Sequence, residues 1–243
     1  MKLFFIDAKK LRYRFYIVSF SIVLIISTIL VTANTIKTAE PVTTDPTVDR
    51  FIIAVDAGHG GYDPGVTLEE LDEKDVNLAI ALKLKEVLFL NGFEVVLTRD
   101  EDEDFLQTSG PKKQKDMAAR KQIIEESGAH YLISIHANSI PGPKWTGAQV
   151  FYQSNREQSE QLGTLIQNQL KNDTQTTREA KPTDFYLTRE IEIIGVVVEA
   201  GFLSNPGERA MLQDEKYQYT IAWSIAKGLI QFLEQNPSRP PLN

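Results

Sequence analysis

The sequence predicts an α/β fold: a single domain with a mostly parallel twisted sheet flanked by helices. Short apolar runs alternate with segments whose apolar residues recur at helical spacing. Some of these runs are apolar on both faces, as in 195–199 (GVVVE), which is typical of strands buried in a parallel sheet. Sites in such sheets form outside the carboxyl ends of the strands, so polar residues that follow the strands are candidates for function.

The elements follow from the apolar pattern and from the residues that interrupt it. Residues 51–56 (FIIAVD) form a short apolar run before a Gly-rich turn and are predicted to be the first strand. Residues 75–90 have helical spacing and stop at Asn91-Gly92. Further strands are expected at 93–98, 130–136, 148–152 and 195–199, and further helices at 116–126, 157–172, 206–212 and 217–233.

The charge is unevenly distributed along the 243 residues, whose net charge is −7. The first 33 residues carry +4, which leaves −11 for the rest. A basic flank, 1–14, precedes an uncharged apolar run, 15–36, which is long enough to cross a bilayer of about 30 Å. A buried core helix would have a polar face, and this run has none. We expect a transmembrane anchor or a signal segment cleaved near Ala33, with the later residues outside the cytoplasm.

The remaining chain divides into three parts. Residues 37–50 combine Thr, Pro and charges without an apolar period and are expected to be a linker. Residues 51–235 have the size of one domain, and 236–243 are a tail. The acidic balance argues against a nucleic-acid partner. Because the chain has no cysteine, disulfides, thiolate metal sites and a cysteine nucleophile are excluded.

Two early segments hold candidate functional residues. His59 lies in a Gly-rich loop, DAGHGGYDPG, directly after the first predicted strand. Its glycines permit a tight turn and leave the imidazole accessible, although a simple loop histidine is the alternative. No Gly-Lys-Ser/Thr follows, so this is not a phosphate loop. Glu73, next to Asp72, opens the long helix, where an acid could also serve only to offset the helix dipole.

Two later strands end in polar residues. His136 closes HYLISIH and is either functional or a structural strand-end histidine. His130 stands at the other end of that strand, on the opposite rim, so we assign it a structural role. Glu199 follows three β-branched residues, where lost hydration raises the pKa of a carboxyl. Such a group is either paired structurally or acts as an acid and base.

Together these residues predict a catalytic zinc site. Two imidazoles and one carboxylate are the ligands of many such sites, with water in the fourth position. Zinc acidifies that water and polarises a carbonyl, and a further carboxylate can pass the proton to a leaving amine. His59, Glu73 and His136 are the candidate ligands, and Glu199 is the candidate general base. The absence of a His-Glu-x-x-His pattern excludes a metalloprotease of that type.

The same segments, in this order, resemble the zinc-dependent N-acetylmuramoyl-L-alanine amidases of bacterial cell walls, the amidase-3 family. The likeness rests on DAGHGGYDPG, DEKDVNLAIALKLKEVL, FEVVLTRDED, SIHANS and VEAGFLSNP and covers residues 51–233. It implies that His59, Glu73 and His136 bind zinc and that Glu199 is the catalytic glutamate. The implied reaction is hydrolysis of the amide between the lactyl group of N-acetylmuramic acid and L-alanine in peptidoglycan.

Other features are similar to the spore-cortex members of that family. These are the single N-terminal membrane segment, the lack of wall-binding repeats, and the segments SGPKKQKDMAARKQII and IPGPKWTGAQVFY. The likeness implies a Gram-positive spore former, a site of action on the forespore or cortex side, and removal of stem peptides on the way to muramic-δ-lactam. Asp56-Ala57 stands where the family commonly has Asp-Pro, which concerns only the turn. The sequence identifies no activating protein partner.

Three alternatives remain open: a vegetative wall amidase, a non-catalytic wall-binding protein on the same fold, and a zinc carboxypeptidase acting on the stem peptide. The last would need an arginine for the free carboxylate, a role open to Arg120. Four side chains are candidates for a substrate groove: Arg120, Asn138, Trp145 and Arg178. Their structural alternatives are, respectively, a surface salt bridge, a turn, a core position and a helix-face charge. The acidic runs 69–75 and 100–104 are expected to be mostly solvated.

Overall fold

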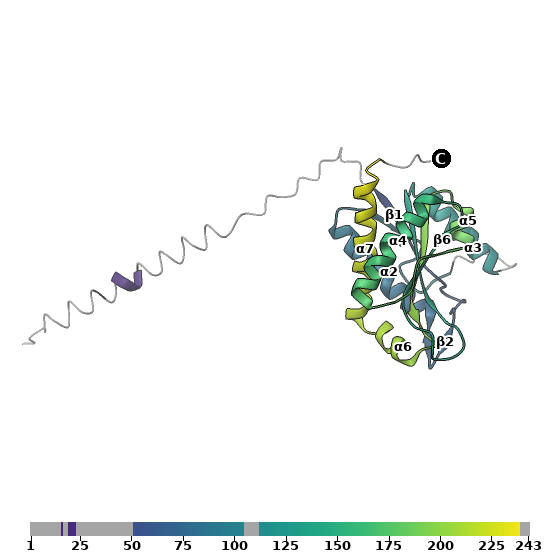
Figure 1. Ribbon diagram of the computed structural model, residues 1–243, viewed down its shortest axis with the longest axis horizontal. Coiled ribbons are helices and arrows are strands. Elements are labelled where there is room, and N and C mark those ends of the chain that lie inside the picture. Colours follow the sequence, from purple (N-terminus) through teal and green to yellow (C-terminus); the bar gives the residue numbers. More distant parts are fainter. Residues whose placement is uncertain (1–15, 17–18, 23–50, 105–111, 239–243) are drawn as a thin grey trace, which may run out of the picture. The chain divides into compact units, whose positions relative to one another are not determined.

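The computed structural model of the chain describes residues 16, 19–22, 51–104 and 112–238 (Figure 1). Residues Met1–Asp49 and Arg50–Asn243 form two separate units. In the described part of the chain, no helix is both long and apolar enough to cross a membrane. The predicted basic flank, the linker, most of the membrane or signal segment and the end of the tail lie outside the described residues.

A six-stranded sheet with the order β4-β1-β5-β8-β6-β7 forms the centre of the second unit. Strands β4, β1, β5 and β8 are mutually parallel, whereas β6 runs antiparallel to β8 and β7 runs parallel to β6. The prediction of a mostly parallel sheet is therefore confirmed. The strands are β1 (Ile52–Ala57), β4 (Glu94–Leu97), β5 (Tyr131–Asn138), β6 (Gln149–Gln153), β7 (Lys181–Thr183) and β8 (Ile194–Phe202).

Helices cover both faces of the sheet (Figure 1). Helices α2, α4 and α7 pack on one face in the larger apolar cluster, and α3 and α5 contribute to a smaller cluster on the other. This arrangement confirms the predicted flanking helices. The helices of this unit are α2 (Glu73–Leu90), α3 (Lys112–Glu126), α4 (Glu157–Thr174), α5 (Tyr186–Glu190), α6 (Pro206–Leu212) and α7 (Glu215–Gln235).

The period of two along a strand explains why the strands are apolar throughout. In β1, Ile53 and Val55 belong to the larger cluster, whereas Ala54 belongs to the smaller one. All nine residues of β8 are buried. Because water reaches neither face of these strands, burial of apolar surface stabilises them from both sides. A polar residue near the end of such a strand is therefore an exception to the apolar pattern.

One predicted helix begins earlier than expected, and two short elements were not predicted. Helix α3 begins at Lys112 rather than at the predicted Asp116, because its first turn (KKQK) has no apolar residue to extend the helical period. Helix α5 has five residues and β7 has three, which is too short for a periodic signal. Strand β7 contains Pro182, and an edge position in the sheet tolerates the missing N–H.

A hairpin, β2 (Thr67–Leu68) and β3 (Leu71–Asp72), precedes α2 and was also not predicted. Its two-residue turn consists of Glu69 and Glu70, with φ of 51° and 66°. Such turns are usually recognised by Asn-Gly or Asp-Gly, so two glutamates carry no turn signal. The hairpin leads the chain from the His59 loop back to the first residue of α2.

Close packing of α7 on α4 generates a stability prediction. A Cβ atom on Gly228 of α7 would lie 2.5 Å from the Cα of Ile166 in α4, so backbone would have to move. We expect Gly228→Ala to lower the free energy of unfolding by about 1–3 kcal/mol, although alanine favours a helix. Gly163→Ala is the control, because its Cβ would meet only side chains, at 3.3 Å or more. Urea midpoints measure both, and equal midpoints would contradict this packing argument.

Candidate active site

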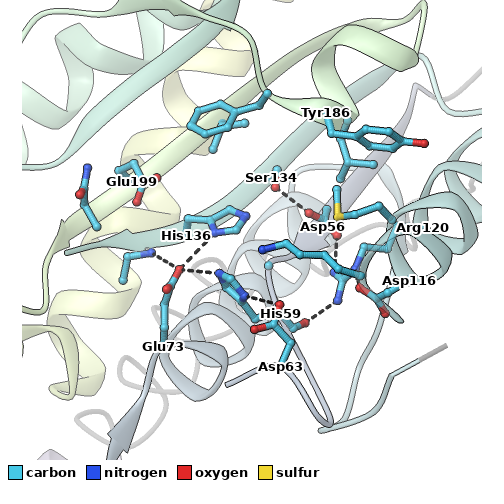
Figure 2. Close-up of a pocket in the computed structure, with 18 of the residues that line it drawn as sticks. Asp56, His59, Asp63, Glu73, Asp116, Arg120, Ser134, His136, Tyr186 and Glu199 are labelled. Carbon is cyan, nitrogen blue, oxygen red and sulfur yellow. Dashed lines mark hydrogen bonds and ion pairs between the residues drawn. The ribbon is translucent and has the colours of Figure 1, made fainter. Parts of the chain in front are cut away.

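Polar side chains converge at the carboxyl edge of the parallel strands. His59 follows β1, and His136 in β5 is paired in register with Glu199 in β8. All three line one cavity of about 520 Å³, together with Glu73 from the start of α2 (Figure 2). The prediction that the polar residues after these strands come together is therefore confirmed.

His59, Glu73 and His136 meet around a single carboxylate oxygen. Glu73 Oε1 lies 3.2 Å from His59 Nε2 and 3.1 Å from His136 Nδ1 (Figure 2). One potential ligand atom from each residue lies within 4.8 Å of the others. Two imidazole nitrogens and one carboxylate oxygen that face the same point form a donor set that fits a zinc ion.

A second carboxylate orients His59. The Nδ1 atom of His59 lies 2.9 Å from Asp63 Oδ2, so Nε2 is the nitrogen that faces Glu73. Metal-binding histidines generally have such a partner on the other ring nitrogen, because it sets both the tautomer and the ring orientation. Asp63 was not singled out from the sequence, although it lies only four residues after His59.

Glycines make room for this arrangement. A Cβ on Gly58 would lie 2.3 Å from His136 Cε1, and one on Gly65 would lie 2.6 Å from Glu73 Oε2. His59 itself has a φ of 62°, a left-handed conformation that is costly for a residue with a side chain. Close contact with the other two residues of the cluster thus explains Gly58 and Gly65, whereas Gly60 and Gly61 lie close to Arg99 and Asp104.

The ionisation states suit a bound cation. Burial of Glu73 disfavours its charged form, but hydrogen bonds to His136 and His59 outweigh burial and hold its pKa below the usual range. Burial also disfavours protonated His59, yet Glu73 and Asp63 raise its pKa on balance. The cluster therefore attracts positive charge, which a metal ion can supply.

Glu199 has the opposite environment. It is only 9 % exposed, and burial in the apolar sheet raises its pKa to about 7, against the attraction of His136 and with added repulsion from Glu73. Its Oε2 atom is buried and has no hydrogen-bond partner in the described structure. A carboxyl that faces the cavity with a pKa near neutrality can both accept and donate a proton.

Arg120 is not the surface salt bridge considered from the sequence. It is 1 % exposed, and its guanidinium pairs with Asp56 at 2.7 Å and with Asp116 at 2.9 Å. It also donates to the backbone carbonyl of His59. Because its charge is balanced by two carboxylates, Arg120 is poorly suited to hold a free substrate carboxylate, although it lines the cavity.

Of the other three groove candidates, only Asn138 lines the cavity. Asn138 ends β5 and lines the cavity. Trp145 is half-buried in a loop rather than in the core, and neither it nor Arg178 lines that cavity. Arg178 follows α4 in a loop rather than on a helix face, and it donates to Thr146 O and Gln149 Oε1. His130 is structural, as predicted, because its Nδ1 accepts from the Ile52 N–H at 3.1 Å.

The acidic run 100–104 is mostly solvated, as predicted, but part of it also supports the His59 loop. Asp102 accepts from the Gly61 N–H at 2.8 Å and pairs with Lys74 at 2.7 Å. Asp104 accepts from the Tyr62 N–H at 3.1 Å. Asp102 is exposed and Asp104 is partly exposed, and both fix the loop through its backbone N–H groups.

An apolar wall of the cavity was also missed from the sequence. It consists of Met117 from α3 with Phe185, Tyr186 and Leu187 from the start of α5. Figure 2 shows Tyr186 across the cavity from Glu73. The signal was absent because α5 is too short to be predicted. Such a wall can bind the unreactive parts of a substrate while the polar residues act on the reacting bond.

Comparison with known proteins decides the family. The model of the N-acetylmuramoyl-L-alanine amidase family, Amidase_3, matches residues 53–231. The chain belongs to this family. It is thus an N-acetylmuramoyl-L-alanine amidase, as the sequence predicted, and its substrate is peptidoglycan. The matched residues include all four of the predicted site residues.

Two relatives are similar to this amidase over most of its length. The amidase is 39% identical over 196 residues to the germination-specific N-acetylmuramoyl-L-alanine amidase of Bacillus subtilis strain 168, covering 78% of this chain and 82% of the relative. Among solved structures, the CwlD amidase of Clostridioides difficile, in complex with the GerS lipoprotein, is 40% identical with a TM-score of 0.73. That match covers 76% of this chain and 100% of the other.

A more distant solved structure shows the same fold. The catalytic domain of CwlV, an N-acetylmuramoyl-L-alanine amidase from Bacillus (Paenibacillus) polymyxa var. colistinus, is 34% identical with a TM-score of 0.67. The match covers 76% of this chain and 98% of that domain. The similarity therefore extends over nearly the whole of an isolated amidase catalytic domain.

The contact between Gly58 and His136 predicts the effect of one methyl group. We expect Gly58→Ala to lower amidase activity about 100-fold or more, because the new Cβ displaces the His136 ring and small misplacements in an active site are costly. The release of stem peptides from purified peptidoglycan measures this effect. Gly163→Ala, distant from the cavity, is the matched control and should retain full activity. An active Gly58→Ala enzyme would show that the ring position is not critical.

Proposed function

We propose that the amidase is zinc-dependent, with His59, Glu73 and His136 as metal ligands and Glu199 as the catalytic acid and base. The observation that carries this proposal is the convergence of two imidazole nitrogens on one ionised carboxylate, beside a second carboxyl with a raised pKa. Such a division of roles between two carboxyls is a frequent property of hydrolytic sites.

The reaction would divide between the metal and the protein. When bound, zinc would polarise the lactyl carbonyl and stabilise the negative charge that develops on its oxygen. Glu199 would accept a proton from the attacking water as the water oxygen bonds to the carbonyl carbon. It would then donate this proton to the nitrogen of L-alanine as the C–N bond breaks. The products are the lactyl carboxylic acid of the sugar and an intact stem peptide.

If Glu199 transfers the proton but does not bind the metal, its substitution should lower turnover and leave zinc binding unchanged. Glu199→Gln should bind zinc within about twofold of the wild type but lose about 10²–10⁴-fold in turnover, because the amide cannot move the proton. Zinc content is measured by elemental analysis, and products are identified by mass spectrometry of digested peptidoglycan. The exposed Glu157, at the start of α4, offers a control, and Glu157→Gln should remain fully active.

Two outcomes of that experiment would contradict the proposal. Near-normal turnover by Glu199→Gln would remove Glu199 from the mechanism, and activity that survives complete removal of metal by a chelator would exclude zinc dependence. The products also separate this reaction from that of a carboxypeptidase. An amidase releases stem peptides that begin with L-alanine, whereas a carboxypeptidase releases single amino acids from the other end.

We further propose that the amidase acts outside the cytoplasm on spore-cortex peptidoglycan, tethered or exported through residues 15–36. Support comes from the similarity to a germination-specific amidase and to CwlD. In this role it prepares muramic acid for conversion to muramic-δ-lactam on the forespore side. Because the CwlD structure contains a lipoprotein, we also propose that a lipoprotein partner binds this amidase.

A deletion strain tests the cortex role. We expect cortex from that strain to lack muramic-δ-lactam and to retain its stem peptides, while vegetative walls and autolysis remain unchanged. Digestion of purified cortex followed by chromatography and mass spectrometry measures both components. Unchanged cortex together with slower vegetative autolysis would favour the alternative of a general wall amidase.

A further inference from the structure

Arg99 is a buried arginine with an unusual set of partners. It lies two residues after β4 and is 2 % exposed. Its guanidinium donates to the backbone carbonyls of Ala57 at 2.9 Å, Gly58 at 3.1 Å, Lys74 at 2.8 Å and Glu101 at 3.1 Å. No ion pair to this group occurs among the described residues. A single side chain therefore gathers four carbonyl oxygens around a positive charge that forms no direct ion pair in the described part of the chain.

The positions of these carbonyls are informative. Ala57 and Gly58 directly precede His59, and Lys74 directly follows Glu73. One guanidinium thus joins the backbone beside two of the three residues in the cluster, which come from different elements. A neighbouring link runs through the amide of Asn77, which donates to the Gly58 carbonyl at 3.1 Å and to Glu73 Oε1 at 3.3 Å.

Comparison with Arg120 suggests what Arg99 does. Both side chains are buried and both donate to the Ala57 carbonyl, but Arg120 is paired with two carboxylates. For Arg99, burial and the charge of Arg120 lower the pKa, and the attraction of Asp56, Asp102 and Asp75 offsets this only in part. A buried cation without an acidic partner costs stability, whereas a planar guanidinium holds several carbonyls in fixed directions. The gain from Arg99 is therefore in geometry more than in overall stability.

We propose that Arg99 is a positioning residue that sets the separation of His59 and Glu73 before a metal binds. The inference rests on the proposed zinc site and adds a residue to it. Arg99 does not line the cavity, so it touches neither the substrate nor the donor atoms. Arg99 holds two separate segments in place before zinc binds, so less free energy is lost in ordering them on binding. Residues that orient metal ligands through hydrogen bonds typically raise metal affinity in this way.

The test is the zinc affinity of Arg99→Lys in the full chain, purified in detergent. Lysine keeps the charge but lacks the planar fork, so it cannot hold the Ala57, Gly58 and Lys74 carbonyls together. We expect zinc affinity to fall about 10- to 100-fold, measured by competition with a chelating dye. The melting temperature of the metal-free protein should fall by only about 4 °C or less, which corresponds to about 1 kcal/mol or less. At saturating zinc, KM for peptidoglycan fragments should stay within about twofold of the wild type.

Arg156→Lys is the matched control. Arg156 likewise donates to backbone carbonyls, those of Arg189, Ile191 and Ile193, but none of these adjoins a cluster residue. This variant should lower the melting temperature of the metal-free protein by a comparable amount and leave zinc affinity unchanged. Arg99→Gln is the second variant. It removes the buried charge and should also fold with weakened zinc binding.

The outcomes are distinct. Wild-type zinc affinity in both Arg99 variants would overturn the proposal, and so would an equal loss of affinity in Arg156→Lys. If both Arg99 variants failed to fold without zinc while Arg156→Lys folded, Arg99 would support the whole fold rather than the site, which would also overturn it. A wild-type protein that binds no zinc would instead refute the proposed zinc dependence.

Discussion

The site depends on the parallel, in-register pairing of three central strands. Strands β1, β5 and β8 all end at the same edge, and pairing of His136 with Glu199 sets these two residues side by side. A slip of β8 by one residue would turn Glu199 to the other face of the sheet, because side chains alternate along a strand. The register of β8 against β5 therefore determines the position of Glu199.

A buried polar network connects this edge of the sheet to its loops. Asp56 accepts hydrogen bonds from Thr98, Ser134 and Arg120, which come from three different segments. Burial opposes ionisation of Asp56, but Arg120 and the two hydroxyls outweigh it and lower its pKa. Arg120 in turn holds the His59 carbonyl. Since a buried charge that loses its partner is costly, these residues form a unit, and this unit also holds the His59 loop.

The elements that could be predicted are those that bury long apolar faces, such as β1, β8 and α2. Their period or apolar content is visible locally, and parallel topology then brings the residues after them to one edge. The supports of the site could not be predicted in this way. Asp102 meets Gly61 across 41 positions in the chain, and Arg99 meets Gly58 across the same distance. Such contacts depend on loop conformation, which no local pattern specifies. For the same reason, no local pattern indicates that Arg120 is buried and paired with two carboxylates.

The two carboxyls of the site show how one fold assigns different chemistry to the same functional group. Glu73 is contacted by two imidazoles, which hold its pKa low, so it stays ionised and can serve as a ligand. Glu199 stands within an apolar strand with one oxygen unpartnered, and its pKa rises to about 7. A metal ligand must not exchange its proton during turnover, whereas a general base must do so. Burial raises the pKa of Glu199, whereas hydrogen bonds from two imidazoles outweigh burial at Glu73, and this difference suits the two carboxyls to the two roles proposed for them.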